Sequence, residues 1–294
     1  MTPATADELW SWLCALARFR PQGGSAGEQV ISVQPEPVRA SVGEHPEAAL
    51  IAAGSGVRAR RALDAQAEQL FERYASLCCP GSPRSAGSAG SECFVVAHLG
   101  QSLDGRIGPP SGEPEAITGP EDMRHNHRMR ALFDVVLVGA GTVCNDDPQL
   151  TVRHVAGENP VRVVLDPDRR LSSKYAIFND GLAPTLLVCR SERASPGERH
   201  GQAEVVGVSD GCGPRAVLAE LARRGSSRIF IEGGGVTVSR FLAADCLDRL
   251  QLAISPLIMG QGRPGIDLGE TLRLRPSVRR FVLEDDVLFE CQFR

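Results

Sequence analysis

The fold is decided by residues 97–153, which read AHLGQSLDGRIGPPSGEPEAITGPEDMRHNHRMRALFDVVLVGAGTVCNDDPQLTVR. This stretch opens on an apolar run and turns at Asp104 and Gly105. It continues through a helical pattern, PEDMRHNHRMRALF (120–133), into a second apolar run, DVVLVGA (134–140). Apolar, β-branched runs that alternate with helical patterns predict an α/β domain.

Further short β-branched runs lie on both sides of these elements. They are CFVVAHL (93–99), PVRVVLD (160–166), PTLLVCR (184–190), AEVVGV (203–208), RIFIEGG (228–234), RLQLAISPLIM (249–259) and FVLEDDVLFECQF (281–293). Helical patterns at 214–225 and 238–248 separate some of them. The last two runs have little between them except a Gly/Pro-rich loop, so we expect antiparallel pairing at the edge of an otherwise parallel sheet.

Residues 1–92 differ in composition and predict a small helical extension. Asp7 is a candidate N-cap for a helix over 8–19, and a second helix is predicted over 57–77. The Gly-, Pro- and Val-rich residues between these helices predict no definite element. The linker PGSPRSAGSAGSE (80–92) places the domain boundary at 92, so the α/β domain covers 93–294.

Composition and charge exclude several classes of function. A net charge of −4 over 294 residues argues against nucleic acid as the main partner. No apolar run approaches the roughly 20 residues of a membrane span, and the N-terminus starts acidic where a signal peptide starts basic. We therefore expect a cytoplasmic protein without a membrane partner. Lys174 is the one lysine among 32 basic residues, so lysine chemistry has a single candidate.

Two glycine-rich loops follow apolar runs. Gly139 and Gly141 give the start of a dinucleotide fingerprint, but Pro148 interrupts the following segment, which lacks the pattern of a crossover helix, so a Rossmann unit is discounted. The second loop, Glu232 followed by the glycines at 233–235, leads into a helical pattern. Three glycines at such a turn favour an anion site over a packing turn, because backbone N–H groups can approach a phosphate there.

With VRVVLDPDRRL (161–171), RIFIEGGG (228–235) and ISPLIMGQGRPGI (254–266), residues 97–153 resemble the reductase domain of the riboflavin-biosynthesis deaminase/reductase family. The resemblance covers about residues 93–294. It implies a dihydrofolate-reductase-like, three-layer α/β fold with a mostly parallel central sheet and an antiparallel edge. It also implies a homodimer and an NADPH-dependent oxidoreductase that reduces a phosphoribosylamino-pyrimidine of the 5-amino-6-(5-phosphoribosylamino)uracil type. Hydride delivery to the ribose C1 would leave a ribityl chain.

The resemblance also implies the site residues. The cofactor-binding positions are Gly100, Ala116, Gly139, Thr142, Asp146, Gly234, Gly235, Val236, Thr237 and Arg240, and the substrate-binding positions are Arg130, Leu150, Arg153 and Glu232. The catalytic candidates are Asp146, His98 and Glu232, and no metal is expected. Arg169 and Arg170, just past Asp166, could meet the 2′-phosphate of NADPH.

Some of these positions also have structural interpretations. Arg130 could be a solvated charge at a helix end, and Asp146 with Asp147 before Pro148 could be turn chemistry. For Asp104, a structural role in the Asp-Gly turn is preferred to a chemical one. Without the family motif, the structural roles of Arg130 and Asp146 would be favoured. With the motif, we favour substrate binding for Arg130 and cofactor binding or catalysis for Asp146.

Departures from the family pattern leave the substrate open. His98 stands where the family usually has a lysine, Pro114 stands where it often has serine, and Ala116 stands where it often has tryptophan. A related reductase of another pyrimidine or a pterin is therefore an alternative, and a non-catalytic nucleotide-binding scaffold is a second. The H-x-E of a zinc deaminase occurs at His45–Glu47 without a following P-C-x-x-C, so the match is interpreted as accidental.

Overall fold

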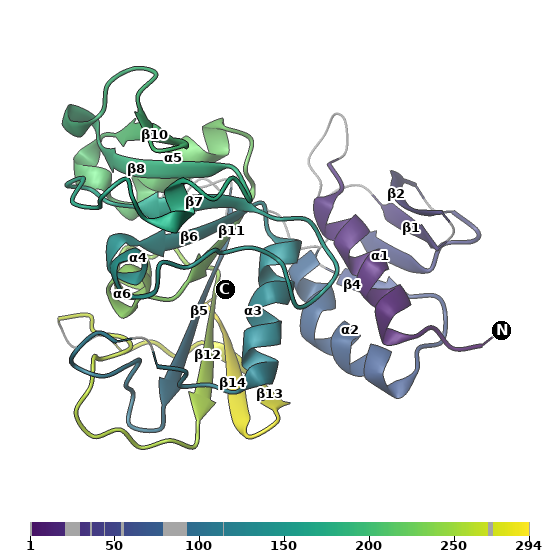
Figure 1. Ribbon diagram of the computed structural model, residues 1–294. Helices are drawn as coiled ribbons and strands as arrows, with labels where there is room; N and C mark the ends of the chain where they lie inside the picture. Colours follow the sequence, from purple (N-terminus) through teal and green to yellow (C-terminus); the bar gives the residue numbers. More distant parts are fainter. Residues whose placement is uncertain are drawn as a thin grey trace. The chain divides into compact units, whose positions relative to one another are not determined.

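The computed structural model describes residues 2–20, 30–35, 37–43, 45–53, 56–78, 93–113, 115–269 and 273–293 (Figure 1). The chain forms two compact units, one made mostly of residues 1–85 and the other mostly of residues 86–294. The predicted linker at 80–92 and Pro114 lie outside the described residues. The boundary at residue 92 therefore stays a prediction.

The N-terminal unit contains the two predicted helices, and it also contains a sheet that the sequence left unassigned. The helices are α1 (Ala6–Arg18) and α2 (Ala65–Cys78). Among the described residues, an antiparallel sheet has the order β2 (Val38–Val42), β1 (Ile31–Pro35), β3 (Leu50–Ala53) and β4 (Gly56–Ala59). Buried Trp12, Leu13 and Tyr74 contribute to the core of this unit.

Two helix boundaries in this unit differ from the prediction. Thr5, not Asp7, caps α1, because its hydroxyl accepts from the Glu8 amide at 3.4 Å while its own amide donates to the Glu8 carboxylate at 2.8 Å. The predicted helix over 57–77 begins only at residue 65, and its first residues belong to β4. Asp64 stabilises this start by accepting from the Ala67 amide at 2.8 Å.

The larger unit is built on a ten-stranded sheet in the described part of the chain. In spatial order, its strands are β13 (Ser277–Leu283), β14 (Asp286–Gln292), β12 (Arg249–Ser255), β5 (Phe94–Ser102), β11 (Arg228–Glu232), β6 (Val135–Gly139), β7 (Val161–Leu165), β8 (Thr185–Arg190), β10 (Ala203–Val208) and β9 (Arg199–His200). Neighbours from β12 to β10 run parallel, whereas β13, β14 and β9 are antiparallel to their partners. The predicted mostly parallel sheet with an antiparallel edge is confirmed.

Helices cover both faces of this sheet, as the three-layer prediction requires (Figure 1). On one face, α5 (Pro214–Arg223) and α6 (Gly235–Ala243) pack their apolar side chains into the main core. On the other face lies α3 (Pro120–Leu132), whose polar side chains meet β5, β11 and β12. The dihydrofolate-reductase-like fold class is confirmed.

Two details refine the expected elements. The run at 281–293 is a hairpin of β13 and β14 and not one strand, because the chain turns between Leu283 and Asp286. The segment after the first glycine loop contains α4 (Ala140–Asp146), a helix of 7 residues. Since α4 is short and Asp147 ends it in the left-handed conformation, with φ 36°, no Rossmann crossover helix forms, as expected.

Candidate active site

Two of the predicted substrate-binding residues form an ion pair across the sheet face. Arg130 lies near the end of α3, and Glu232 ends β11. The Arg130 Nε donates to Glu232 Oε2 at 2.7 Å, and its Nη2 donates to Oε1. Both side chains are largely buried, so this is a paired, oriented guanidinium and not a solvated helix-end charge. Arg130 is therefore not the solvated helix-end charge of the structural interpretation, and its role in substrate binding stays a prediction.

The other two substrate positions lie on a segment next to this pair. Arg130 Nη1 donates to the Thr151 carbonyl at 2.7 Å, which fixes the residue between Leu150 and Val152. Leu150 is 2% exposed and adopts φ 52°, a left-handed conformation that is strained for a leucine. Arg153 Nη1 donates to Gln149 Oε1 at 2.7 Å and to Thr151 Oγ1 at 2.8 Å. The four predicted substrate positions therefore come together.

Four of the predicted cofactor positions form a second cluster, where β6 and β11 end side by side. Gly139 ends β6, and a Cβ there would lie 2.4 Å from Thr237 Oγ1. Gly234 adopts φ 71°, and a Cβ there would lie 3.0 Å from Thr142 Oγ1. A side chain at either position would require the facing threonine hydroxyl to move. The cluster places backbone amides and two hydroxyls at the start of α6, which suits a phosphate.

The remaining cofactor positions are arranged less uniformly. Gly235 packs under the loop at 264–265, since a Cβ there would lie 2.1 Å from the Gly265 carbonyl oxygen. Val236 is 77% exposed and Arg240 is also exposed. Ala116 is exposed in a loop.

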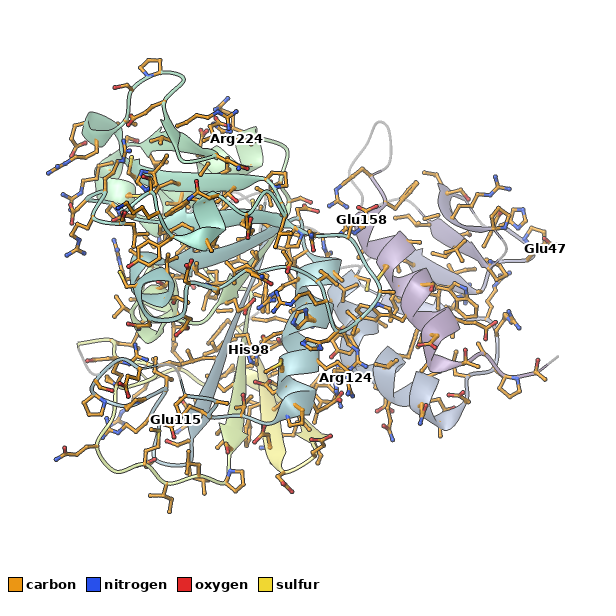
Figure 2. The ribbon with its side chains drawn as sticks, in the orientation of Figure 1. Glu47, His98, Glu115, Arg124, Glu158 and Arg224 are labelled. Carbon is orange, nitrogen blue, oxygen red and sulfur yellow. The ribbon has the colours of Figure 1, made fainter. Side chains whose placement is uncertain are left out.

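His98 is buried under α3 and paired with an acid that the sequence reasoning missed (Figure 2). Its Nε2 lies 3.2 and 3.3 Å from the two carboxylate oxygens of Asp122, which also accepts from the Thr118 hydroxyl at 2.7 Å. A Cβ at Gly100 would lie 2.9 Å from Thr118, so this pair adjoins a predicted cofactor position. Burial opposes ionisation of Asp122, but the charge and hydrogen bond of His98 lower the pKa of that carboxyl to about 2.

The His98 pair belongs to a polar row across four adjacent strands. In register, Glu290 of β14 lies opposite Gln251 of β12, Gln251 opposite His98, and His98 opposite Glu232. His125 of α3 bonds Gln251 Oε1 at 2.9 Å, and Gln251 Nε2 donates to Glu290 Oε2 at 3.0 Å. The sequence alone could not reveal this row, because only the register of the paired strands places these residues opposite one another. The one available signal was the low hydrophobicity of α3.

The two aspartates at the end of α4 have different roles. Asp147 is structural, because its carboxylate accepts from the backbone amides of Ala176 at 2.9 Å and Ile177 at 3.3 Å. Asp146 is exposed to solvent. Desolvation by the surrounding chain raises the pKa of its carboxyl, and the guanidinium of Arg263 opposes this rise.

Two further predictions concern residues outside these clusters. The structural role of Asp104 agrees with its contacts, since it accepts from Gly260 N at 2.7 Å and Ser102 Oγ at 2.6 Å. Arg169 is committed to Glu198 and to the Arg193 carbonyl at 3.1 Å. It is therefore not free as the sole contact for a cofactor 2′-phosphate, whereas the neighbouring Arg170 is exposed.

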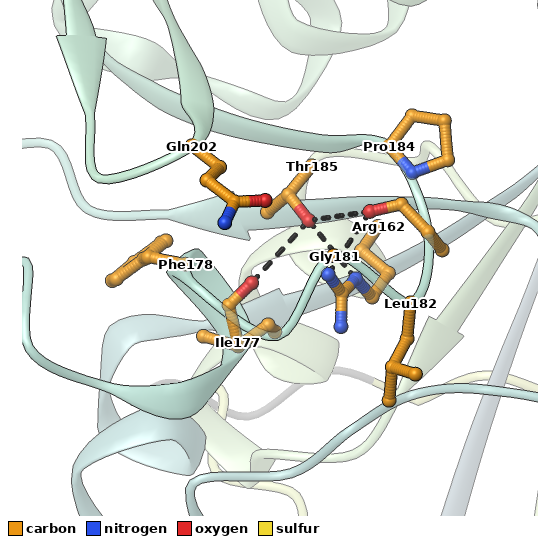
Figure 3. A pocket seen from close by; sticks show the side chains of 9 residues that line it. Arg162, Ile177, Phe178, Gly181, Leu182, Pro184, Thr185 and Gln202 are labelled. Atoms are coloured by element: carbon orange, nitrogen blue, oxygen red, sulfur yellow. Dashed lines mark hydrogen bonds between the residues drawn. The ribbon is translucent and has the colours of Figure 1, made fainter.

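A cavity of about 360 Å³ is lined by residues from the first part of β7 and β8, among them Arg162 and Thr185 (Figure 3). Arg162 dominates its lining, but its guanidinium is fully used. It donates to Asp180 twice at 2.7 Å, to Thr185 at 2.9 Å, and to the Gln149 and Ala183 carbonyls at 3.0 Å. All five N–H groups of this arginine thus have partners in the protein, and none remains to donate to a ligand.

The fold and the two clusters define a class of protein: an α/β domain with a glycine-lined strand-to-helix turn beside a paired arginine and glutamate. A protein family described as the RibD C-terminal domain matches residues 93–282. The chain therefore belongs to this family. In the described residues, no helix is both long and apolar enough to span a bilayer.

Individual relatives agree with this assignment. The riboflavin biosynthesis protein RibD of Aquifex aeolicus is 32% identical, over 67% of this chain and 57% of that protein. A 2,5-diamino-6-ribosylamino-4(3H)-pyrimidinone 5′-phosphate reductase of Methanothermobacter thermautotrophicus is 35% identical, over 67% of this chain and 96% of that protein. The chain thus spans little more than half of the longer, RibD-type relative.

A solved structure shows the same fold. A deaminase/5-amino-6-(5-phosphoribosylamino)uracil reductase of Thermotoga maritima matches with a TM-score of 0.60 and 32% identity. The match covers 69% of this chain and 57% of that chain. The predicted family and fold are thus confirmed, and the match leaves most of residues 1–92 outside the shared part.

Proposed function

We propose that the protein is an NADPH-dependent reductase of a phosphoribosylamino-pyrimidine in riboflavin biosynthesis. The observation that carries the proposal is the position of Glu232. Its carboxylate is fixed by Arg130 in the substrate cluster, and the next residues are the glycines of the nucleotide cluster. One strand end therefore brings a sugar-phosphate site and a dinucleotide site into contact, as a hydride transfer between two bound molecules requires.

The residues of the second cluster fit a nicotinamide dinucleotide. Gly139 and Gly234 leave room for close backbone approach, and the start of α6 offers amides to a pyrophosphate. When bound, the dihydronicotinamide supplies a hydride for C1 of the sugar. We propose NADPH over NADH, with Arg170 as the candidate contact for the 2′-phosphate.

The chain's own residues orient the substrate and supply a proton. The C1–ring oxygen bond breaks, C1 receives the hydride and the ring oxygen receives a proton, which leaves a ribityl chain. Arg130 and Arg153 offer guanidinium groups to the phosphate, and Glu232 accepts from a sugar hydroxyl. Of the two candidate proton donors, we favour Asp146 because it is exposed and its pKa is raised, whereas His98 is buried and bound to Asp122.

A reductase of a different pyrimidine or a pterin is the second candidate function. The observation that favours it is the His98–Asp122 pair, which stands where the family resemblance expects a lysine. A short, buried histidine cannot extend a positive charge to a ligand as a lysine can. Turnover of a pterin panel alongside the phosphoribosylamino-pyrimidine separates the two reductases.

A non-catalytic scaffold is disfavoured by the fixed Arg130–Glu232 pair, which nucleotide binding alone does not need. The first test is NADPH binding, measured by the change in NADPH fluorescence on titration with protein. Saturable binding supports both reductases, and its absence overturns them together. We also propose a cytoplasmic homodimer, and sedimentation of the purified protein tests the dimer.

A further inference from the structure

The segment at 149–153 carries two substrate positions but has no helix or strand of its own. Its backbone is held by side chains from the surrounding scaffold. The bonds are Arg162 to the Gln149 carbonyl at 3.0 Å, Arg130 to the Thr151 carbonyl at 2.7 Å, the Val152 amide to Asn159 at 2.8 Å, and the Arg153 amide to His127 at 2.9 Å. The position of each residue therefore depends on its side-chain anchor.

His127 is the anchor of Arg153. It lies on α3, one turn before Arg130, and is 1% exposed. Its Nδ1 accepts from the Arg153 amide, so the ring proton must sit on Nε2 and the imidazole must be neutral. Burial, together with the nearby charges of Arg130, His154 and Arg153, lowers the pKa of His127 to about 3. At neutral pH the Nδ1 of His127 is therefore unprotonated and can accept the hydrogen bond from the Arg153 amide.

The two arginines held in this way repel one another. Partial burial lowers the pKa of Arg153, and the neighbouring Arg130 lowers it further. Within the part of the chain that the structure describes, Arg130 is in an ion pair with a carboxylate and Arg153 is not. Two guanidinium groups held near each other in this way favour an anion between them. Their convergence depends on the backbone position of Arg153, which His127 fixes.

We propose that His127 is a positioning residue, which holds the Arg153 main chain so that the guanidinium groups of Arg130 and Arg153 meet the phosphate of the substrate. The inference rests on the proposed function, because the phosphate belongs to the proposed substrate. His127 acts through Arg153 and takes no part in the chemical step. It decides how strongly the enzyme distinguishes a phosphorylated sugar from an unphosphorylated one.

The test compares His127→Leu, which removes the acceptor, with His127→Asn, whose Oδ1 can take the place of Nδ1. We expect His127→Leu to raise KM for the phosphorylated substrate about tenfold, equivalent to about 1.4 kcal/mol, while kcat and KM for NADPH change less than twofold. KM for the dephosphorylated substrate stays the same, and His127→Asn recovers most of the loss. Equal loss for both substrates, or no recovery by a folded His127→Asn protein, overturns the inference.

Binding of ribose 5-phosphate, measured by calorimetry, needs no turnover and separates the two proposals. If the wild type binds it more tightly than His127→Leu but reduces no pyrimidine, the proposed function fails and the positioning role stands. If the wild type turns over and both variants behave like it, the positioning role fails alone. If the wild type does not bind ribose 5-phosphate, the inference is overturned. Should His127→Leu not fold, the comparison of His127→Asn with wild type decides.

Discussion

Glu232 accepts two hydrogen bonds from Arg130, a residue 102 positions earlier in the chain. β11 enters the sheet between β5 and β6, which brings its last residue beneath α3. Because the glycines at 233–235 follow directly, this one pair links the substrate and nucleotide clusters. The predictions below begin from it.

Replacing Glu232 with glutamine keeps the shape of the side chain but removes the charge that fixes Arg130. We expect Glu232→Gln to raise the substrate KM at least about tenfold, equivalent to about 1.4 kcal/mol, while NADPH binding stays within twofold. Steady-state kinetics with each reactant varied in turn checks this. The control is Glu220→Gln on α5, which removes the ion pairs of Glu220 with Arg223 and Arg224 and should change neither constant. Wild-type kinetics for Glu232→Gln would remove the pair from the account.

Gly234 is expected to be indispensable for the nucleotide site. Gly234→Ala combines a left-handed backbone with a methyl group against Thr142 Oγ1, so NADPH affinity should fall about tenfold or more and stability by about 1–3 kcal/mol. Fluorescence titration and urea unfolding measure the two effects. Gly225→Ala is the matched control, because φ is 87° there but a Cβ meets nothing within 4 Å, at the opposite end of β11. It should lose stability and keep NADPH affinity. Equal loss of affinity in both variants would mean that strain alone is responsible.

The His98–Asp122 pair should show strong non-additivity. His98→Leu leaves the buried Asp122 carboxylate without its imidazole partner, and the expected cost is about 3–5 kcal/mol in the free energy of unfolding. The double variant His98→Leu, Asp122→Leu removes both polar groups and should be more stable than His98→Leu. Urea unfolding of the two single variants and the double variant at neutral pH measures the coupling. Simple addition of the two single losses would show that the groups do not interact.

Neutral, buried His127 makes the protein sensitive to acid. Its pKa is about 3 when folded and about 6.5 when unfolded, so the unfolded chain binds more protons between these values. The free energy of unfolding therefore falls as pH drops from about 6.5 towards 3. His127→Asn removes the titrating group, so the free energy of unfolding should depend less on pH in this range. Urea unfolding at several pH values measures this. An unchanged slope would mean that the pKa of His127 is the same in the folded and the unfolded protein, which contradicts a buried, neutral imidazole.

The sequence predicts the larger unit well because its signals are local. β-branched runs mark the parallel strands, and the family resemblance singles out Arg130, Arg153 and Glu232, which the structure brings together around Thr151. The sequence does not predict that Asp122, Gln251 and Glu290 lie near the site. They become part of one polar row only through the register of β12, β14 and β5 and the position of α3 above it.

The misses in the N-terminal unit have local causes. Its strands are only four or five residues long and lack long apolar runs. The hydrophobic pattern of such short strands cannot be distinguished from that of a loop. The cap of α1 could have been predicted, because Thr5 and Glu8 have the spacing of a capping box. Asp7 is an equally good capping residue by type, and only the geometry decides between them.

The proposed reductase activity is measured by incubating the purified protein with NADPH and 5-amino-6-(5-phosphoribosylamino)uracil, and following both loss of NADPH absorbance and formation of the ribityl product. We expect one product per NADPH oxidised for the wild type, and a rate about tenfold lower for Glu232→Gln at subsaturating substrate. A protein that binds NADPH but leaves this pyrimidine unreduced, under conditions in which a known reductase consumes it, would contradict the claim.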